Sequence, residues 1–595
     1  MIDAFKDRFD SFHQQQQGLE KTSSRLSWAR TILFLSIISL VIYGLSSDSP
    51  VALIALIPVG ISFYYMVIKH RKVERALTIN QTLKDINLEE IKRIQLDLHD
   101  FEGGEAYIAE DHPYQQDLDI FGRHSIYQLL SRCEMPDSKH MLGTWLSGPA
   151  DLQTIKQRQE SASELSSKLD WRQSFQANNR INLNKKKKSN PHLSNKDILD
   201  WAKKDEPSFN TKLWRIIAYL MGFLVVLSAY LIFAEGVVYH IIYPTVIING
   251  IILGSTIKRL NTVAHGIDHA HYMIETYAQS LNMIEKESFT SEHLKTLQNK
   301  LIGEKQSSTS AIRSLSRLSH RLSSRSNMLY GVLDGLFLLD VHLVGNLLDW
   351  KKDNHLKIQT WFEVVNEMEC LLSVASLLHA HPEYKFPTMV DQPFHFKCEK
   401  IGHPLIKTAE KVKNDYSITG KGSVDIITGS NMSGKSTFQR TIGLSMVMAQ
   451  CGCPVDAASL EMGPVQVFTS MRTKDNLEEH TSSFYAELRR ISQLLELASQ
   501  QNTTFFVLDE ILKGTNSDDR HKGSIALVRK LTDKNAFGMV STHDLELGKI
   551  ATSGVRNFSF NSKILNNEII FDYTLTEGLC QSFNASKLME NMGIL

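Results

Sequence analysis

The sequence predicts a mixed fold: membrane α-helical hairpins, an α-helical lever or core domain, and a C-terminal α/β domain. Four apolar segments predict the hairpins. A long region with helical spacing and few Pro or Gly residues predicts the lever. A buried strand, a glycine-rich loop and a helix follow one another after Asp425, and this order predicts the α/β domain. A chain of 595 residues is long enough for all three parts.

The apolar segments form two pairs, Thr31–Ser46 with Val51–Ile68 and Leu213–Phe233 with Val237–Ile257. A helix needs about 20 apolar residues to cross a bilayer, and roughly 17 is the lower limit. The second pair meets this length, and the first pair relies on flanking residues. Buried helices of a soluble protein are the alternative interpretation.

Flanking charge favours the membrane interpretation. Lys and Arg residues stand at the outer ends of the segments, whereas the short connections carry acids, Asp48 and Glu235; the outer residues are Arg25, Arg30, Lys69, Arg71, Lys72, Lys212, Arg215, Lys258 and Arg259. This positive-inside pattern predicts an integral membrane protein with four transmembrane helices, whose termini and large domains are cytoplasmic. The segments carry almost no ionisable residues, so we expect anchors rather than a transport path.

Composition divides the chain into six parts. They are a polar N-terminal segment (1–28), a first hairpin (29–72), the first part of the helical core or lever (73–210), a second hairpin (211–259), the second part of the lever (260–400) and the C-terminal domain (401–595). The lysine-rich stretch Asn184–Pro191 is a solvated loop or a basic patch, and the loop is favoured.

Net charge and cysteines limit the partners. Lys and Arg total 65 and so do Asp and Glu, so no global field draws in nucleic acid or acidic lipid. Six cysteines are scattered, and only Cys451 and Cys453 are close. No second pair completes a zinc site, and we expect reduced thiols and no zinc. The mostly polar N-terminal stretch predicts no cleavable signal peptide.

One local basic feature lies in the second part of the lever. Arg313, Arg317, Arg321 and Arg325 are spaced four apart, which on a helix makes one slowly drifting stripe. The stripe could follow the phosphates of nucleic acid or of lipid headgroups. The favoured alternative is a solvated face that pairs with carboxylates elsewhere in the fold.

The glycine-rich loop fits the pattern G-x-x-x-x-G-K-S/T, with the strand before it and the helix after it that the pattern requires. Backbone N–H groups of such a loop point at phosphate oxygens. Lys435 would hold the terminal phosphates and Ser436 would bind Mg²⁺. The expected nucleotide-binding residues are Gly429, Ser430, Asn431, Met432, Ser433, Gly434, Lys435, Ser436 and Thr437.

Two further predicted strands end in residues that could take part in ATP hydrolysis. The apolar run before Asp509 and Glu510 predicts a strand that ends in two acids. We expect Asp509 to complete the Mg²⁺ shell and Glu510 to act as general base toward water. His543 ends a third strand and could sense the terminal phosphate. The C-terminal domain is therefore predicted to be a P-loop, ABC-like ATPase domain that uses ATP and Mg²⁺.

These motifs and their order resemble the MutS family of DNA mismatch-recognition ATPases. The family patterns N-M-x-G-K-S-T, S-T-F-x-x-E, D-E-x-x-x-G-T and T-H correspond here to stretches that begin at Asn431, Ser482, Asp509 and Thr542. In the family, the serine at the place of Ser482 reaches the ATP of the opposite subunit, which implies a homodimer. The resemblance is weaker upstream, from about residue 115, where it implies the family's core and lever.

The sequence also departs from the family. It leaves no room for the N-terminal domain that reads mismatches, so ATP hydrolysis and dimerisation carry over better than mismatched-DNA binding. The predicted function is a membrane-anchored MutS-like ATPase. One alternative is an ATP-gated membrane scaffold for a protein or lipid. Another is an ABC-type exporter, against which the absence of L-S-G-G-Q counts.

Overall fold

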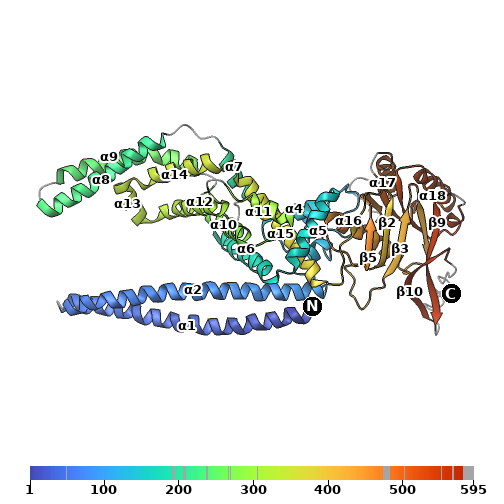
Figure 1. Cartoon of the computed structure of the whole chain (residues 1–595), viewed down its shortest axis with the longest axis horizontal. Coiled ribbons are helices and arrows are strands. Elements are labelled where there is room, and N and C mark those ends of the chain that lie inside the picture. The colour runs from blue at the N-terminus through green and yellow to red at the C-terminus, as the bar shows by residue number, and fades with distance from the viewer. Residues whose placement is uncertain are drawn as a thin grey trace.

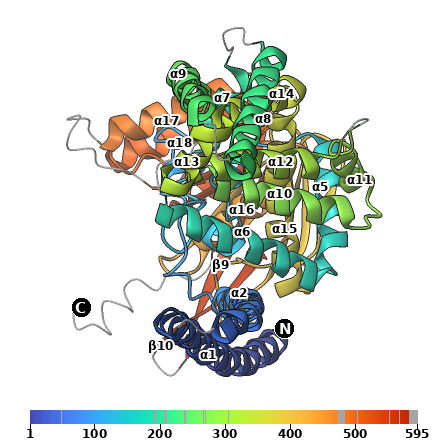
Figure 2. The same cartoon turned by 90° about the vertical axis from the view of Figure 1, so that its left-hand side faces the viewer.

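The computed structural model describes the chain except residues 48–49, 190–193, 205–209, 236–238, 265–266, 268–269, 304–305, 473–482, 501–502, 551–552, 566–567 and 581–595. Figure 1 shows an elongated molecule with β-sheets at one end and two helical arms that extend to the other end. In Figure 2, viewed along the arms, the two arms lie apart from each other. Helices dominate and α/β sheets occupy the C-terminal part, which agrees with the predicted mixed class.

The first arm is a hairpin of two long helices, α1 (Ile2–Ser46) and α2 (Pro50–Ile94). Each helix has 45 residues, far more than the roughly 20 that span a bilayer core. The predicted apolar segments form only the distal end of this arm. Its polar end docks on the helical body, where Phe5 is buried and Arg8 donates to Asp170 at 2.6 Å. The polar N-terminal segment is thus a continuous part of α1.

The second arm combines elements from distant parts of the sequence. Helices α8 (Thr211–Glu235) and α9 (Tyr239–Ala264) pair with each other, and α13 (Met328–Phe337) and α14 (Leu339–Asn354) pack on both. The last two helices meet at 86° through Leu338, whose φ is 52°. The sequence interpretation placed residues 328–354 in the lever, but the structure places them beside the second hairpin.

Among the described residues, α1, α2 and α8 are long and apolar enough to cross a membrane, and the bent pair α13–α14 is a fourth candidate if it counts as one span. The helix α9, which carries most of the fourth predicted segment, is not among the candidates found in the described residues. The start of that segment, residues 237–238, lies outside the described residues.

Asn249 fastens α13 to the second arm. Its side chain is fully buried, and Nδ2 donates to the carbonyl oxygens of Gly335 and Leu336 at 3.1 and 2.9 Å. These two carbonyls belong to the last turn of α13 and have no partner within their own helix. The side chain of Asn249 in α9 therefore caps the C-terminal end of α13, which packs against α9.

Replacement of Asn249 by leucine is expected to lower the stability of the detergent-solubilised chain by about 1–2 kcal/mol, because two half-buried carbonyls lose their donor. The midpoint of thermal unfolding, followed by intrinsic fluorescence, measures the effect. Ile247→Leu on an exposed position of the same helix is the matched control and should leave the midpoint unchanged. Equal midpoints for both variants would contradict this role of Asn249.

The helical body connects the arms to the sheets. Its helices are α3 (Ile126–Leu130), α4 (Pro136–Leu146), α5 (Leu152–Ser166), α6 (Leu169–Ser189), α7 (Asn195–Lys203), α10 (His271–Lys286), α11 (Glu292–Asn299), α12 (Ser308–Ser323) and α15 (Ile358–Ala380), with short 3₁₀ turns η1 (Glu105–Tyr107) and η2 (Ser324–Ser326). Pro136 stands at the start of α4, where a proline costs no hydrogen bond. The expected loop at 184–191 is wrong for its first six residues, which continue α6.

The predicted arginine stripe is wrong at its last member. Arg313, Arg317 and Arg321 lie exposed on α12, but that helix ends at Ser323. Arg325 follows in η2 and turns toward the buried Asp340 of α14, with Nη2 2.7 Å from Oδ2. The stripe thus has three solvent-facing arginines, and the fourth makes the kind of ion pair that the alternative interpretation expected.

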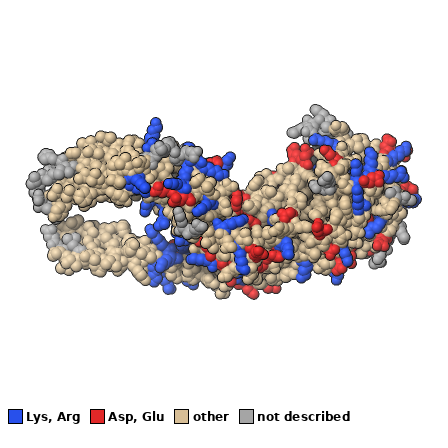
Figure 3. All heavy atoms as spheres, turned by 45° about the horizontal axis from the view of Figure 1, so that its top comes forward, with Lys and Arg blue, Asp and Glu red and all other residues tan. Residues whose placement is uncertain are grey.

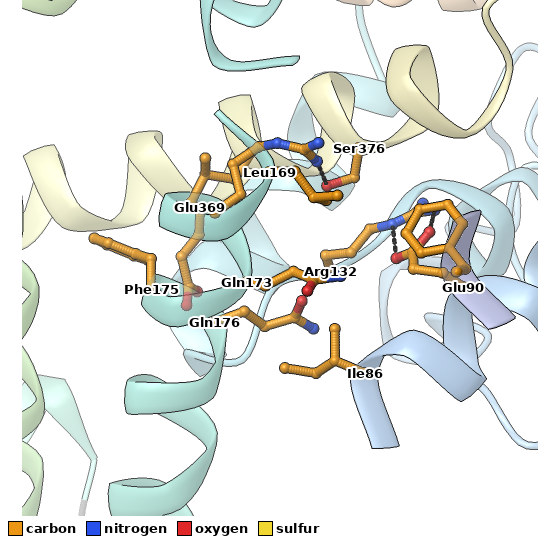
Figure 4. A pocket seen from close by; sticks show the side chains of 12 residues that line it. Ile86, Glu90, Arg132, Leu169, Gln173, Phe175, Gln176, Glu369 and Ser376 are labelled. Carbon is orange, nitrogen blue, oxygen red and sulfur yellow. Dashed lines mark hydrogen bonds and ion pairs between the residues drawn. The ribbon is translucent and has the colours of Figure 1, made fainter. Parts of the chain in front are cut away.

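A buried polar cluster joins the first arm to the body (Figure 4). The guanidinium of Arg132 donates to both carboxylate oxygens of Glu90 in α2, at 2.9 and 2.7 Å, and both side chains are almost fully buried. Burial raises the pKa of Glu90, but Arg132 outweighs it and leaves that pKa at about 2. Nearby, burial raises the pKa of Glu369 to about 7, although Asn179 donates to it. Where the first arm meets the body, the buried carboxylate of Glu90 is therefore paired with the guanidinium of Arg132.

Two β-sheets form the other end of the molecule. A four-stranded sheet has the order β1 (Thr388–Met389), β5 (Ser459–Met462), β2 (His395–Ile401), β3 (Asn414–Thr419). A six-stranded sheet has the order β10 (Glu568–Glu577), β9 (Val555–Leu565), β4 (Val424–Gly429), β8 (Ala536–Thr542), β7 (Thr504–Asp509), β6 (Gln466–Ser470). All neighbours in the six-stranded sheet are parallel except β9 and β10, which are antiparallel.

Helices cover both faces of the six-stranded sheet. Helix α16 (Lys435–Cys451) packs on one face, and α17 (Ser483–Leu497) and α18 (Ser517–Thr532) pack in a separate apolar cluster on the other. The central strands β4, β7 and β8 are almost wholly buried. Their carboxyl ends therefore share one edge, where ligands bind in open parallel sheets.

Candidate active site

The glycine-rich loop connects β4 to α16 as the sequence predicts. Gly434, with φ of 103°, precedes the first residue of α16, and a side chain there would meet Tyr573. The first turn of α16 holds no acidic residue. No carboxylate in that turn therefore neutralises the positive N-terminal end of the helix dipole. Ser433 is buried, and its Oγ has no hydrogen-bond partner in the described part of the chain. These features fit a phosphate group.

Lys435 is buried at the base of the same loop. Its Nζ donates to the carbonyl oxygens of Gly429 and Ser430 at 2.9 and 3.0 Å. Burial lowers the pKa of Lys435, while the nearby carboxylates of Glu510 and Asp509 act in the opposite direction. The loop's own carbonyls thus hold the ammonium beside the two acids that end β7.

Ser436 and Asp509 meet at the edge of the sheet. The hydroxyl of Ser436 donates to Oδ2 of Asp509 at 2.7 Å, and Ser541 of β8 donates to Oδ1. A hydroxyl and a carboxylate oxygen at this separation are the kind of ligands that Mg²⁺ prefers. The residues present therefore fit the expected metal. Among the described residues, no group of three or more His, Cys, Asp or Glu side chains is arranged for another metal ion.

Glu510 follows β7 with φ of 51°, a conformation that turns its side chain toward the end of β8. There Nε2 of His543 lies 2.7 Å from Oε1, and Nζ of Lys513 lies 3.1 Å from Oε2. The hydrogen bond with His543 lowers the pKa of Glu510 to about 2. The carboxylate is therefore ionised and oriented, as a group that polarises water must be.

Glu487 of α17 supports this edge, a role that the sequence analysis did not assign. Its Oε1 accepts from the backbone N–H of Leu512, two residues after Glu510. Phe484 of the same helix lies so close to Gly514 that a side chain on that glycine would collide with it. The S-T-F-x-x-E pattern contains both residues, but the spacing alone does not show which loop they contact.

Gln439 is a second residue without a sequence signal. It is fully buried in α16, and Nε2 donates to the carbonyl oxygen of Leu508 at 3.1 Å. This bond fixes the loop helix against the strand that presents Asp509. Asn431 and Met432 lie exposed on the loop, Thr437 lies exposed in the first turn of α16, and Ser430 is half-buried. Ser482 lies outside the described residues.

The site lies within a region that matches a known protein family: residues 425–590 match MutS domain V. Over 237 residues the chain is 32% identical to MutS protein homolog 4 of Mus musculus. This similarity covers 37% of this chain and 24% of that protein. It is 26% identical over 316 residues to the DNA mismatch repair protein MutS of Staphylococcus epidermidis, and this similarity covers 52% of this chain and 34% of that protein.

A third relative is the DNA mismatch repair protein MutS of Caldanaerobacter subterraneus, 28% identical over 255 residues, or 42% of this chain and 29% of that protein. The chain thus spans about a quarter to a third of the length of these relatives. The C-terminal part of the chain is thus similar to domain V of the MutS family, and the chain resembles MutS proteins over part of their length.

Proposed function

We propose that the chain is a membrane-anchored, MutS-like ATPase that binds and hydrolyses ATP as a dimer. The observation that carries the proposal is the convergence of four side chains on the loop between β4 and α16. Ser436 contacts Asp509 at 2.7 Å, and Glu510 contacts His543 at 2.7 Å. The resemblance to the MutS family indicates ATP as the substrate, and the two apolar arms indicate the membrane anchor.

Each residue has a role in this proposal. Bound ATP with Mg²⁺ supplies the phosphoanhydride that is cleaved and a Lewis acid. Lys435 and the loop N–H groups hold phosphate oxygens, and Ser436 and Asp509 hold the metal. Glu510 accepts a proton from water while His543 fixes its orientation. The dimer follows from the family pattern at Ser482, which reaches the opposite subunit's ATP.

The arms support the membrane part of the proposal. Figure 3 shows two lobes almost without charged atoms, and Lys and Arg gather at the base of each lobe. Large exposed apolar side chains cover both lobes; among them are Leu35, Ile42, Ile54, Ile61, Ile216, Tyr219, Phe223 and Ile251. Such a surface is unfavourable in water and favourable in lipid. We propose that both lobes enter the membrane from one side.

Sodium carbonate extraction at high pH tests this anchor. The full chain is expected to remain in the membrane pellet, because its apolar lobes and not its charges hold it there. A peripheral membrane protein in the same preparation is the control and should enter the supernatant. Release of the chain with that control would contradict the anchor, whatever the ATPase does.

A second candidate function is an ATP-gated membrane scaffold that binds a protein or lipid in place of DNA. It is favoured by the apolar arms, which stand at the far end of the body from the sheets. The ATPase rate of the solubilised chain with and without duplex DNA separates the two. Stimulation that weakens steeply with salt supports a DNA role, and no response even at low salt supports the scaffold.

A further inference from the structure

A basic cavity of about 760 Å³ lies between the first arm and the helical body. Residues of α1, α2, α6, α10 and α12 line it, and its volume is typical of a ligand pocket. Its Lys and Arg residues are Arg30, Arg71, Arg75, Lys185, Arg317 and Arg321, and its acidic residues are Glu74 and Glu275. Six cations against two carboxylates leave a formal charge of +4 with the histidines neutral.

The two carboxylates of this basic cavity already have partners. Glu275 accepts from Ser316 and Gln279, each at 3.0 Å. Glu74 contacts His70 at 3.3 Å. By contrast, none of the six Lys and Arg side chains has a carboxylate within 4.0 Å among the described residues. The carboxylates of the described residues therefore leave the positive charge of the cavity largely unneutralised.

The position of the basic cavity indicates where that ligand comes from. Arg30 directly precedes the apolar segment of α1, and Arg71 follows the apolar segment of α2 by three residues. Trp28 and Tyr64 are exposed on the same stretch of the arm, as aromatic residues are at a membrane surface. If the lobes enter a bilayer, the cavity lies at the level of the phosphate groups.

We infer that the basic cavity binds the phosphate-bearing headgroup of an anionic phospholipid. This inference rests on the proposed membrane anchor. The space between the two apolar lobes ends near the Lys and Arg atoms at their base (Figure 3), and it would receive the acyl chains. Arginine suits this task because its planar guanidinium donates two hydrogen bonds to one phosphate. Polar groups such as Asn182 and Tyr272 line the same wall and can donate to headgroup oxygens.

The test uses the full chain purified in a mild neutral detergent. Native mass spectrometry counts the bound lipids while dioleoyl-phosphatidylglycerol or dioleoyl-phosphatidylcholine is titrated. We expect one phosphatidylglycerol to bind at least about tenfold more tightly than phosphatidylcholine, because its headgroup carries a net negative charge that the basic residues of the cavity attract.

A pair of double variants separates the cavity from general surface charge. Arg317→Gln with Arg321→Gln removes two charges from its wall and should reduce the preference for phosphatidylglycerol by about tenfold. Lys69→Gln with Lys72→Gln removes two exposed charges from the same level of α2, outside the cavity, and should change it less than about twofold. Equal losses in both double variants would overturn the inference.

Soluble competitors identify the source of the phosphate. Glycerol 3-phosphate or a short DNA duplex that displaces phosphatidylglycerol at equal concentration would overturn lipid binding, in favour of a soluble phosphate or nucleic acid. Failure of the anchor is distinguishable from failure of this inference. A chain that resists carbonate extraction yet shows no preference between the two lipids overturns the inference alone, whereas a chain released by carbonate overturns both.

Discussion

Replacement of Glu510 by glutamine is expected to lower the ATP turnover of the purified chain by at least about a hundredfold, with ATP binding retained. The amide keeps the size and the hydrogen-bonding reach of the side chain but cannot accept the proton of the attacking water. The measurement is steady-state phosphate release, together with the dissociation constant of a fluorescent ATP analogue. Lys435→Ala should abolish turnover and also weaken nucleotide binding, since its ammonium holds phosphate oxygens.

Glu546→Gln is the matched control for Glu510→Gln. Glu546 is an exposed glutamate that pairs only with Lys549 three residues later, on the same edge of the domain. The same chemical change there should leave turnover within about twofold, because exposed pairs contribute little. Turnover that survives in both variants would reject Glu510 as the base. The pKa of Glu510, about 2, predicts in addition that the base stays ionised through mildly acidic pH.

Replacement of Glu90 by alanine is expected to destabilise the chain by about 3–5 kcal/mol, because it leaves the guanidinium of Arg132 buried without its carboxylate. The thermal unfolding midpoint of the solubilised chain measures the loss. Glu160→Ala is the control, since Glu160 makes a 3.9 Å exposed pair with Lys156 and should cost less than about 1 kcal/mol. Equal midpoints for the two variants would contradict the proposed role of the buried pair.

The pH dependence of the Glu90 pair has a defined sign. The pKa of Glu90 is lowered from 4.5 to about 2 in the folded chain. The folded state therefore binds the proton less readily than the unfolded state does. The pair's contribution is fully present above pH 4.5 and is lost as the pH falls from 4.5 toward 2. In Glu90→Ala, this part of the acid sensitivity should disappear.

Much of the sheet edge could be predicted from the sequence because it depends on local order. A buried strand, a glycine-rich loop and a helix are contiguous in the chain, and so are β7 and the two acids that end it. Strand ends in a parallel sheet meet at one edge. The contact of Ser436 with Asp509 therefore follows once the strands are recognised. The contact of Glu487 with Leu512 does not, because it joins a helix to a loop that lies 25 residues later in the chain.

The second arm was harder to predict. Residues 328–337 are too short to read as a spanning helix, and their helical spacing also suits a soluble lever. Only packing on α8 and α9, and the bonds from Asn249, show that they belong with the apolar arm. The fate of Arg325 likewise depends on where α12 ends and on Asp340, fifteen residues away in the sequence. Periodicity cannot supply such information.

By itself, the sequence determined the order of the motifs, the resemblance to the MutS family and the division into apolar and polar segments. Each of these depends on residues that are close in the chain. Only the tertiary structure decided that Arg317 and Arg321 of α12 line one cavity together with Arg71 and Arg75 of α2. More than 200 residues separate these two walls in the sequence, and their charges come together only because the first arm lies against the helical body that contains α12.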